Sequence, residues 1–84
     1  MLKIKDDVDL KELEKFGFEK DKTAIKWILY SYKCKTERAR FLVEINKLRE
    51  LNVFECRDYP DSAQCFGEFL FDLIQAGLVE KVEE

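Results

Sequence analysis

The sequence contains no histidine, so it lacks the side chain that most often serves as a general base near neutral pH and as an imidazole ligand of metals. Its three glycines are dispersed, which leaves no glycine-rich loop to hold a phosphate group. Serine occurs only at Ser31 and Ser62, which are better explained as a strand residue and a helix-cap residue. We therefore expect a protein that is not an enzyme, with no catalytic residue, no metal and no cofactor.

Cysteine is scarce and is not arranged in pairs. Cys34, Cys56 and Cys65 form no CxxC motif, and their odd number argues against a framework of disulfides. Cys34 lies between Lys33 and Lys35, and neighbouring cations lower the pKa of a thiol. Its place in an alternating apolar pattern nevertheless favours a packed strand position. We expect all three cysteines to act as small apolar side chains.

Long apolar runs are absent as well. No segment is apolar for long enough to span a bilayer, and the first residues, MLKIKDDVD, lack the apolar stretch of a signal peptide. With 84 residues, 46% hydrophobic and 39% charged, the composition is that of a small folded domain. We expect a single domain over residues 1–84, located in the cytoplasm without contact to a membrane.

Two glycines mark where helices are expected to end. Gly17 follows a short apolar pattern that begins after Asp9, whose carboxylate can accept hydrogen bonds from the first turn of a helix. Gly77 ends a longer pattern, for which Asp61 is the expected cap and Ser62 the alternative. These signals predict a short N-terminal helix and a second helix over residues 62–76. The second helix has one apolar stripe that we expect to be core, formed by Ala63, Phe66, Phe69, Leu70, Leu73 and Ile74.

The middle of the chain has strand character. Residues 27–35 alternate between two faces and are rich in aromatic and aliphatic side chains, which predicts a strand. Residues 36–57 fit either a helix or a hairpin that turns at Asn46 and Lys47, and we favour the hairpin because a lone strand needs partners. The expected fold is therefore α+β: a short N-terminal helix, an antiparallel meander of three or four strands, and a C-terminal amphipathic helix packed on one face of the sheet. A mostly helical fold is the alternative.

The last predicted helix carries more apolar surface than one core stripe requires. Phe71 falls outside that stripe, beside Gly67 and Leu78. Glycine within a helix costs about 1 kcal/mol relative to alanine, so Gly67 indicates close approach by the sheet or by a partner. We predict that Gly67, Phe71 and Leu78 form a partner contact, and the exposed side of the sheet, where aromatic residues make good anchors, is the alternative contact surface. Gly67 and Phe71 could equally form a homodimer interface. The simpler alternative is that Phe71 widens the core.

Charge is distributed unevenly along the chain. Residues 20–40 carry seven Lys or Arg against two acids, whereas residues 1–19 have a net charge of −2 and residues 41–84 a net charge of −6. Such a basic segment fits either a solvated surface or binding of single-stranded nucleic acid by charge and stacking. The residues expected to make the nucleic-acid contact in this alternative are Lys26, Trp27, Tyr30, Tyr32, Lys33, Lys35, Arg38 and Arg40.

Both ends of the chain resemble known sequences. The opening KIKDDVDLKELEKFGF and the closing FLFDLIQAGLVEKVEE are similar to the ends of small phage-encoded and prophage-encoded proteins of low-GC Gram-positive bacteria, whose middle is variable, aromatic-rich and strand-like. The resemblance implies origin in a mobile element and transfers no catalytic residue. It leads us to expect an interaction module that binds and inhibits or redirects a host protein, such as a component of a defence system.

Overall fold

A computed structural model describes residues 1–22 and 27–82 of the chain. The predicted α+β class is confirmed, and the mostly helical alternative is excluded. The short N-terminal helix is a 3-10 helix, η1, rather than an α-helix. In chain order the elements are β1 (Leu2–Ile4), η1 (Leu10–Phe16), β2 (Glu19–Lys20), β3 (Ile28–Lys35), β4 (Arg40–Asn46), β5 (Leu51–Glu55), α1 (Ser62–Gln75) and β6 (Val79–Lys81).

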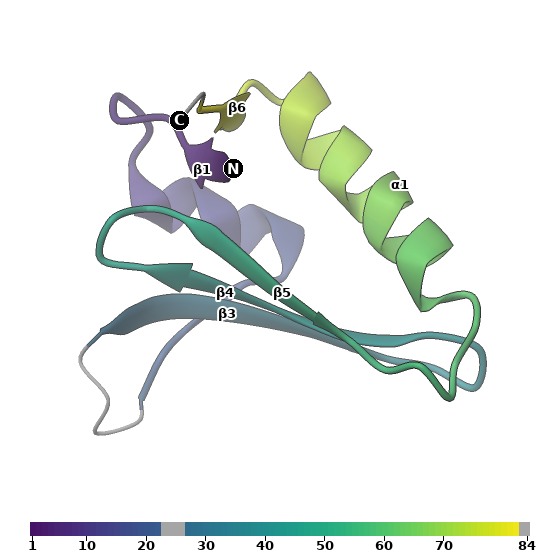
Figure 1. The fold of residues 1–84 in the computed structure, drawn as a ribbon. Helices are drawn as coiled ribbons and strands as arrows, with labels where there is room; N and C mark the ends of the chain where they lie inside the picture. Colours follow the sequence, from purple (N-terminus) through teal and green to yellow (C-terminus); the bar gives the residue numbers. More distant parts are fainter. Residues whose placement is uncertain (23–26, 83–84) are drawn as a thin grey trace.

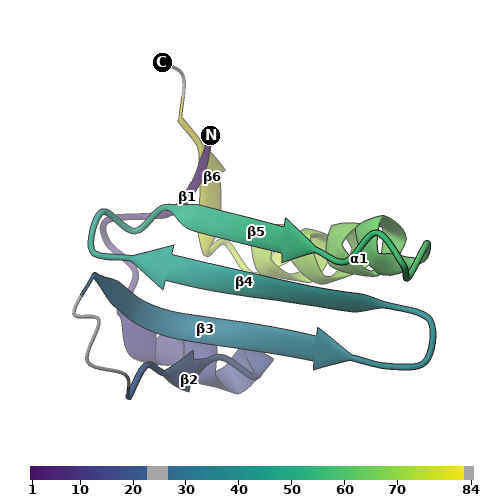
Figure 2. The same ribbon diagram turned by 60° about the horizontal axis from the view of Figure 1, so that its bottom comes forward.

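The main sheet has four antiparallel strands in the order β2-β3-β4-β5. It contains the predicted strand, as β3, and the predicted hairpin, as β4 and β5. The hairpin forms because the Asn46 side chain accepts hydrogen bonds from the amides of Leu48 and Glu50, at 2.9 and 3.1 Å. Both helices lie on the same side of this sheet (Figure 1). Figure 2 shows the opposite face in front, with both helices behind it.

The core fills the space between the sheet and the helices. Tyr32, Val43 and Val53 lie opposite one another on β3, β4 and β5, so their side chains share the inner face. Tyr32 stacks on Phe69 of α1 with 4.1 Å between ring centroids, and Phe18 lies 5.6 Å from Tyr32. Each such aromatic pair contributes about 0.5–1.5 kcal/mol beyond the apolar area that it buries. These contacts fix α1 against the sheet.

The glycines predicted to end the helices do so. Gly17 and Gly77 have φ of 94° and 76°, a conformation that glycine adopts without the steric penalty of a Cβ atom. After each glycine the chain folds back: the Phe18 amide donates to the Leu13 carbonyl at 3.2 Å, and the next helix ends in the same way. A Cβ atom on Gly17 would lie 3.0 Å from the ring of Tyr32, so this turn also brings the backbone close to the core.

The start of α1 differs from the predicted cap. Asp61 is the N-cap residue, but within the described residues its side chain makes no capping hydrogen bond. Ser62 is buried, and its hydroxyl accepts from the Arg40 amide at 2.9 Å and donates to the Cys56 carbonyl at 3.4 Å. The hydroxyl therefore joins the start of α1 to β4 and to the loop after β5, instead of capping its own helix.

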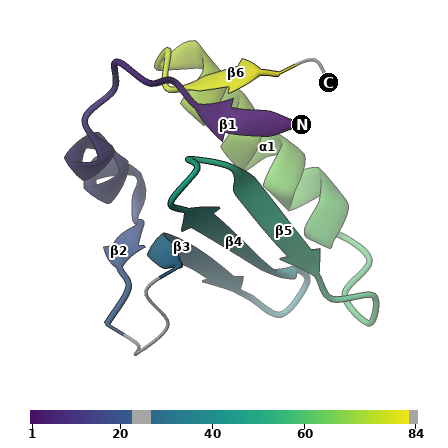
Figure 3. The ribbon, with the colours of Figure 1, turned by 60° about the vertical axis from the view of Figure 1, so that its left-hand side comes forward.

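A second sheet, absent from the sequence prediction, joins the two ends of the chain. β1 and β6 pair antiparallel, with Ile4 opposite Val79, and both ends of the described chain lie at this ribbon (Figure 3). Arg49, in the turn between β4 and β5, holds the N-terminal segment in place. Its Nη1 donates to the carbonyls of Lys5 and Val8 at 2.8 and 2.7 Å, and its own carbonyl accepts from the Ile4 amide at 2.8 Å.

Candidate interaction surfaces

One part of the exposed surface of α1 is apolar. Ala63, Gly67, Phe71 and Ile74 follow one another at intervals of four, four and three residues, which places them on one side of a helix. All four are exposed; the side chains of Phe71 and Ile74 are 58% and 46% exposed. We call this set the helix stripe. Polar and acidic residues border it on one side, including Glu68.

The helix stripe corrects two parts of the sequence prediction. Ala63 and Ile74 are not core residues, because α1 contacts the sheet through a narrower face on which Leu73 is completely buried. Leu78 is not placed for a partner contact, because it is 7% exposed and packs in the core. Of the three residues predicted to contact a partner, Gly67 and Phe71 are at the surface together.

Gly67 lies in open space. A Cβ atom built on it would meet nothing within 4 Å among the described residues, so the expected close approach of the protein's own sheet is wrong. The helix thus carries the cost of a glycine, about 1 kcal/mol relative to alanine, without a contact inside the described chain that requires it. The sequence analysis gave two explanations for a glycine at position 67, close approach by the sheet or by a partner. Approach by a partner is the explanation that remains.

Replacing Gly67 with alanine is expected to stabilise the protein by about 0.5–1 kcal/mol, because alanine favours the helix and its methyl group meets no neighbour in the described part of the chain. Thermal unfolding should show a midpoint raised by several degrees, since about 1 kcal/mol shifts a small domain by about 4–8 °C. Gly17→Ala is the matched control. It should lower the midpoint, because Gly17 has a positive φ and little space. A lower midpoint for Gly67→Ala would contradict the open environment.

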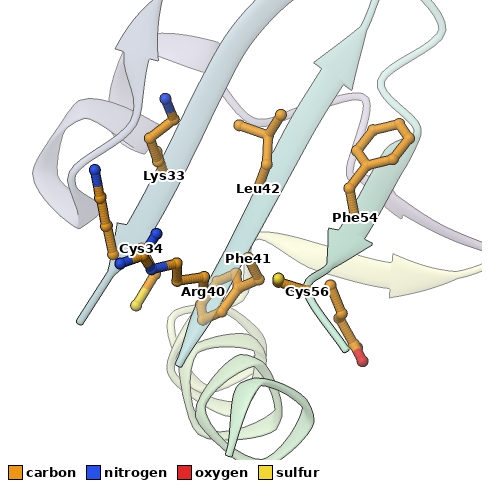
Figure 4. Close-up of a pocket in the computed structure, with 9 residues that line it drawn as sticks. Lys33, Cys34, Arg40, Phe41, Leu42, Phe54 and Cys56 are labelled. Carbon is orange, nitrogen blue, oxygen red and sulfur yellow. The ribbon is translucent and has the colours of Figure 1, made fainter. Parts of the chain in front are cut away.

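The outer face of the sheet carries a second candidate surface. Figure 4 shows Lys33, Leu42 and Phe54 side by side on β3, β4 and β5, in agreement with their register as direct neighbours. Phe54 is 56% exposed. These residues border a depression of about 390 Å³, which we call the open-face pocket. Its lining consists of Lys33, Cys34, Lys35, Arg40, Phe41, Leu42, Phe54, Glu55 and Cys56.

Three cations give the open-face pocket a basic character: Lys33, Lys35 and Arg40. The guanidinium carbon of Arg40 lies 4.3 Å from the centre of the Tyr59 ring, a cation–π contact that orients the side chain. The Nε atom of Arg40 is buried and has no hydrogen-bond partner among the described residues. Glu55 is the acidic residue in the lining.

The residues predicted to bind nucleic acid do not share one surface. Tyr30 is 7% exposed and Tyr32 stacks on Phe69, so both rings face the helices and are not available to stack on bases. Burial is also the main reason why the pKa values of both tyrosines are raised. Trp27 is 47% exposed, and Lys26 lies outside the described residues. Arg38 is exposed and lines a different depression, beside the start of α1.

The sequence analysis did not identify Phe54 as an exposed aromatic residue. Its signal was present in the alternation of β5, which places Phe54 on the face opposite to Leu51 and Val53. In the fold, Leu51 and Val53 pack against the core and Phe54 projects from the other face of the sheet. The sequence contains no indication of which face the helices cover.

The three cysteines are free thiols and are partly buried. Burial raises the pKa of Cys65, and the neighbouring Glu68, Cys34 and Asp61 add to the effect in that order. A raised pKa leaves less of the reactive thiolate at a given pH. At pH 8, Cys65 should therefore react with iodoacetamide more slowly in the native protein than in urea, as measured by peptide mass spectrometry. Equal rates would contradict this environment.

Comparison of the chain with protein-family models, with curated proteins and with solved structures gave no match. No helix within residues 1–22 and 27–82 is long and apolar enough to cross a membrane. The two surfaces described above are therefore the basis for a functional proposal.

Proposed function

We propose that the protein is a non-enzymatic interaction module, of mobile-element origin, that acts in the cytoplasm of a bacterial host. It binds a host protein, such as a component of a defence system, and inhibits or redirects it. The helix stripe is the contact surface. The resemblance of both chain ends to phage-encoded proteins supports an origin in a mobile element. The exposed apolar residues of α1 support the binding of another protein.

The observation that carries the proposal is the exposure of Phe71 and Ile74 next to Gly67. Large apolar side chains at the centre of an interface often dominate binding, and aromatic residues are prominent among them. Phe71 is 58% exposed although the same helix buries Leu73 completely. The helix stripe thus offers apolar area that the core does not use, and adjacent exposed apolar side chains of this kind favour a contact surface.

The proposal is tested by using the protein as bait in lysate of a low-GC Gram-positive host. Phe71→Ala is the test variant and Phe54→Ala the matched control, because the two phenylalanines have nearly equal exposure, 58% and 56%, on different surfaces. Recovery of a specific partner should fall about tenfold or more with Phe71→Ala and stay unchanged with Phe54→Ala. Loss of the partner only with Phe54→Ala would refute the helix stripe as the contact.

The open-face pocket supports a second candidate function, the binding of single-stranded nucleic acid. Lys33, Lys35 and Arg40 gather beside the exposed ring of Phe54, which combines charge for phosphates with a surface for stacking. In this candidate function the ring of Phe54 stacks on a base, which is the role that the sequence predicted for Tyr30 and Tyr32.

Titration of a fluorescent single strand at low and high salt tests this candidate. Lys33→Glu with Lys35→Glu should abolish binding, and Phe54→Ala should weaken it, since stacking contributes about 1–3 kcal/mol per base. Lys11→Glu with Lys81→Glu is the control, because it changes the net charge equally at other exposed positions. If the control variant lost binding to the same extent, the loss would result from net charge alone and not from the open-face pocket. Absence of binding at low salt would exclude this candidate function.

A further inference from the structure

Resting on the second candidate function, we infer that the open-face pocket binds a nucleotide through its phosphate monoester. The ligand is either a free mononucleotide or the phosphorylated end of a single strand. The pocket has a charged side and an apolar side, and the side chain of Arg40 on the charged side makes no hydrogen bond to any other described residue. Together these features favour a terminal phosphate over the interior of a strand.

Two rows of side chains on the outer face of the sheet form the pocket. In the first row, Lys33, Leu42 and Phe54 are direct neighbours on β3, β4 and β5 (Figure 4). Lys35 and Arg40 are direct neighbours in the second row, two residues further along each strand, and residues two apart share a face. All three cations therefore come from β3 and the start of β4, whereas the exposed ring comes from β5.

This separation of charge from apolar area matches the two ends of a nucleotide. A phosphate fits beside the cations, and a base can stack on the ring of Phe54, which is 56% exposed. Neighbouring strands are about 4.8 Å apart, so the backbones of Lys33 and Phe54 are about 10 Å apart, with Leu42 between them. The volume of about 390 Å³ lies within the range of small-molecule sites, about 300–1,000 Å³.

The charged side of the pocket has no carboxylate among the described residues. Glu55 is part of the lining, but it lies opposite the buried Phe41, so its side chain belongs to the inner face of the sheet. Glu44 lies on the outer face two residues from Leu42 and does not line the pocket. A phosphate monoester carries a charge of about −1.5 to −2 at pH 7, whereas each internal phosphate of a strand carries one negative charge. Three cations without a nearby acid match the monoester better.

Arg40 supports a phosphate ligand most strongly. Its side chain is partly buried and is oriented by the ring of Tyr59, yet within the described residues it makes no hydrogen bond and no ion pair. Arginine has five donors in a planar fork that can bind two oxygens of a phosphate at once. A buried donor without an acceptor is uncommon, and an anion is one of the groups that can satisfy it.

The test measures fluorescence anisotropy of six-nucleotide thymidine strands that carry a dye on a central base. One strand has a phosphate at its 5′ end, one at its 3′ end and one at neither end. At low salt, one of the two phosphorylated strands should bind the full chain about tenfold tighter or more than the strand without a terminal phosphate. A strand two nucleotides longer without a terminal phosphate has about the same charge and should not bind as tightly.

Variants of the pocket test which residues read the terminal phosphate. Arg40→Lys should remove the preference, because lysine keeps the charge but loses the planar fork. Arg38→Lys is the matched control, since Arg38 is exposed and lines a different depression. Lys33→Gln with Lys35→Gln leaves Arg40 unchanged and should also reduce the preference about tenfold, at positions whose exposure preserves the fold. Phe54→Ala should weaken all strands to a similar extent, because stacking does not depend on the terminal phosphate.

Competition separates the two sources of the ligand. The thymidine monophosphate that matches the preferred strand end should displace the strand at a concentration at least tenfold lower than thymidine or inorganic phosphate. If this monophosphate binds as tightly as the strand, the ligand is a free nucleotide. If the strand binds at least tenfold tighter, the ligand is the end of a strand.

Three results would overturn the inference: equal affinity of the three strands, an equal loss with Arg38→Lys and Arg40→Lys, or displacement by inorganic phosphate as strong as by the monophosphate. The second candidate function fails separately. It stands if all strands bind equally in a manner that depends on Lys33 and Lys35, and it fails together with the inference if none binds at low salt. Capture of a host protein through Phe71 depends on neither outcome.

Discussion

Replacing Leu73 with alanine is expected to lower the free energy of unfolding by about 2–5 kcal/mol, the range observed when a buried leucine is truncated and leaves a cavity. Leu73 is 0% exposed and belongs to the core cluster between α1 and the sheet. A domain of this size has a total stability of about 5–15 kcal/mol, so the variant should lose a large part of it. Urea unfolding should show a lower midpoint with an unchanged slope.

Phe71→Ala is the counterpart on the outward side of the same helix. Because Phe71 is 58% exposed, its truncation should change the free energy of unfolding by no more than about 0.5 kcal/mol. The two variants together separate the side of α1 that holds the fold from the side available for binding. If Phe71→Ala destabilised the protein as strongly as Leu73→Ala, Phe71 would be part of the core and the helix stripe would lose its main residue.

Replacing Arg49 with alanine is expected to cost about 2–4 kcal/mol. The guanidinium donates two hydrogen bonds at 2.7–2.8 Å to backbone carbonyls of the N-terminal segment. Hydrogen bonds from a charged group contribute about 1.5–3 kcal/mol each, and their removal leaves both carbonyls without this donor. Hydrogen exchange should also become faster in residues 2–8, which Arg49 attaches to the hairpin.

Arg49→Gly provides the control for the backbone. Arg49 has φ of 66°, a conformation that costs a residue with a Cβ atom about 1 kcal/mol or more and costs glycine little. The glycine variant loses the same side chain but relieves this strain, so it should be more stable than the alanine variant by about 1 kcal/mol. If both variants equalled the wild type in urea unfolding, the two side-chain hydrogen bonds would make no net contribution.

Local signals in the sequence were sufficient to predict most of the helices, strands and turns of the fold. The positive φ at Gly17 and Gly77, the strand β3 and the hairpin turn at Asn46 all follow from interactions between residues near one another in the chain. The pairing of β1 with β6 was not predictable in this way. Each strand has three residues, too few for a clear alternation, and the partners lie at opposite ends of the sequence. The hydrogen bonds from Arg49 to the carbonyls of Lys5 and Val8 are also long-range, because 44 and 41 positions in the sequence separate donor and acceptor.

The candidate surfaces were predictable only in part. The helix pattern separated Phe71 from the core residues but placed Ile74 among them, because the apolar arc of α1 is wider than the face that meets the sheet. The alternation of β3 separated Tyr30 and Tyr32 from the lysines correctly, yet it could not show that the helices cover the tyrosine side. The exposed aromatic of the sheet, Phe54, follows once the covered face is known.

Site-specific photo-crosslinking in host cells tests whether the helix stripe is the contact surface. A benzophenone amino acid replaces Phe71 in one variant and Phe54 in a second, since the two positions are almost equally exposed on separate surfaces. We expect a specific adduct with a host protein from position 71 and none from position 54. An adduct from position 54 alone, or adducts of equal yield from both positions, would contradict this expectation.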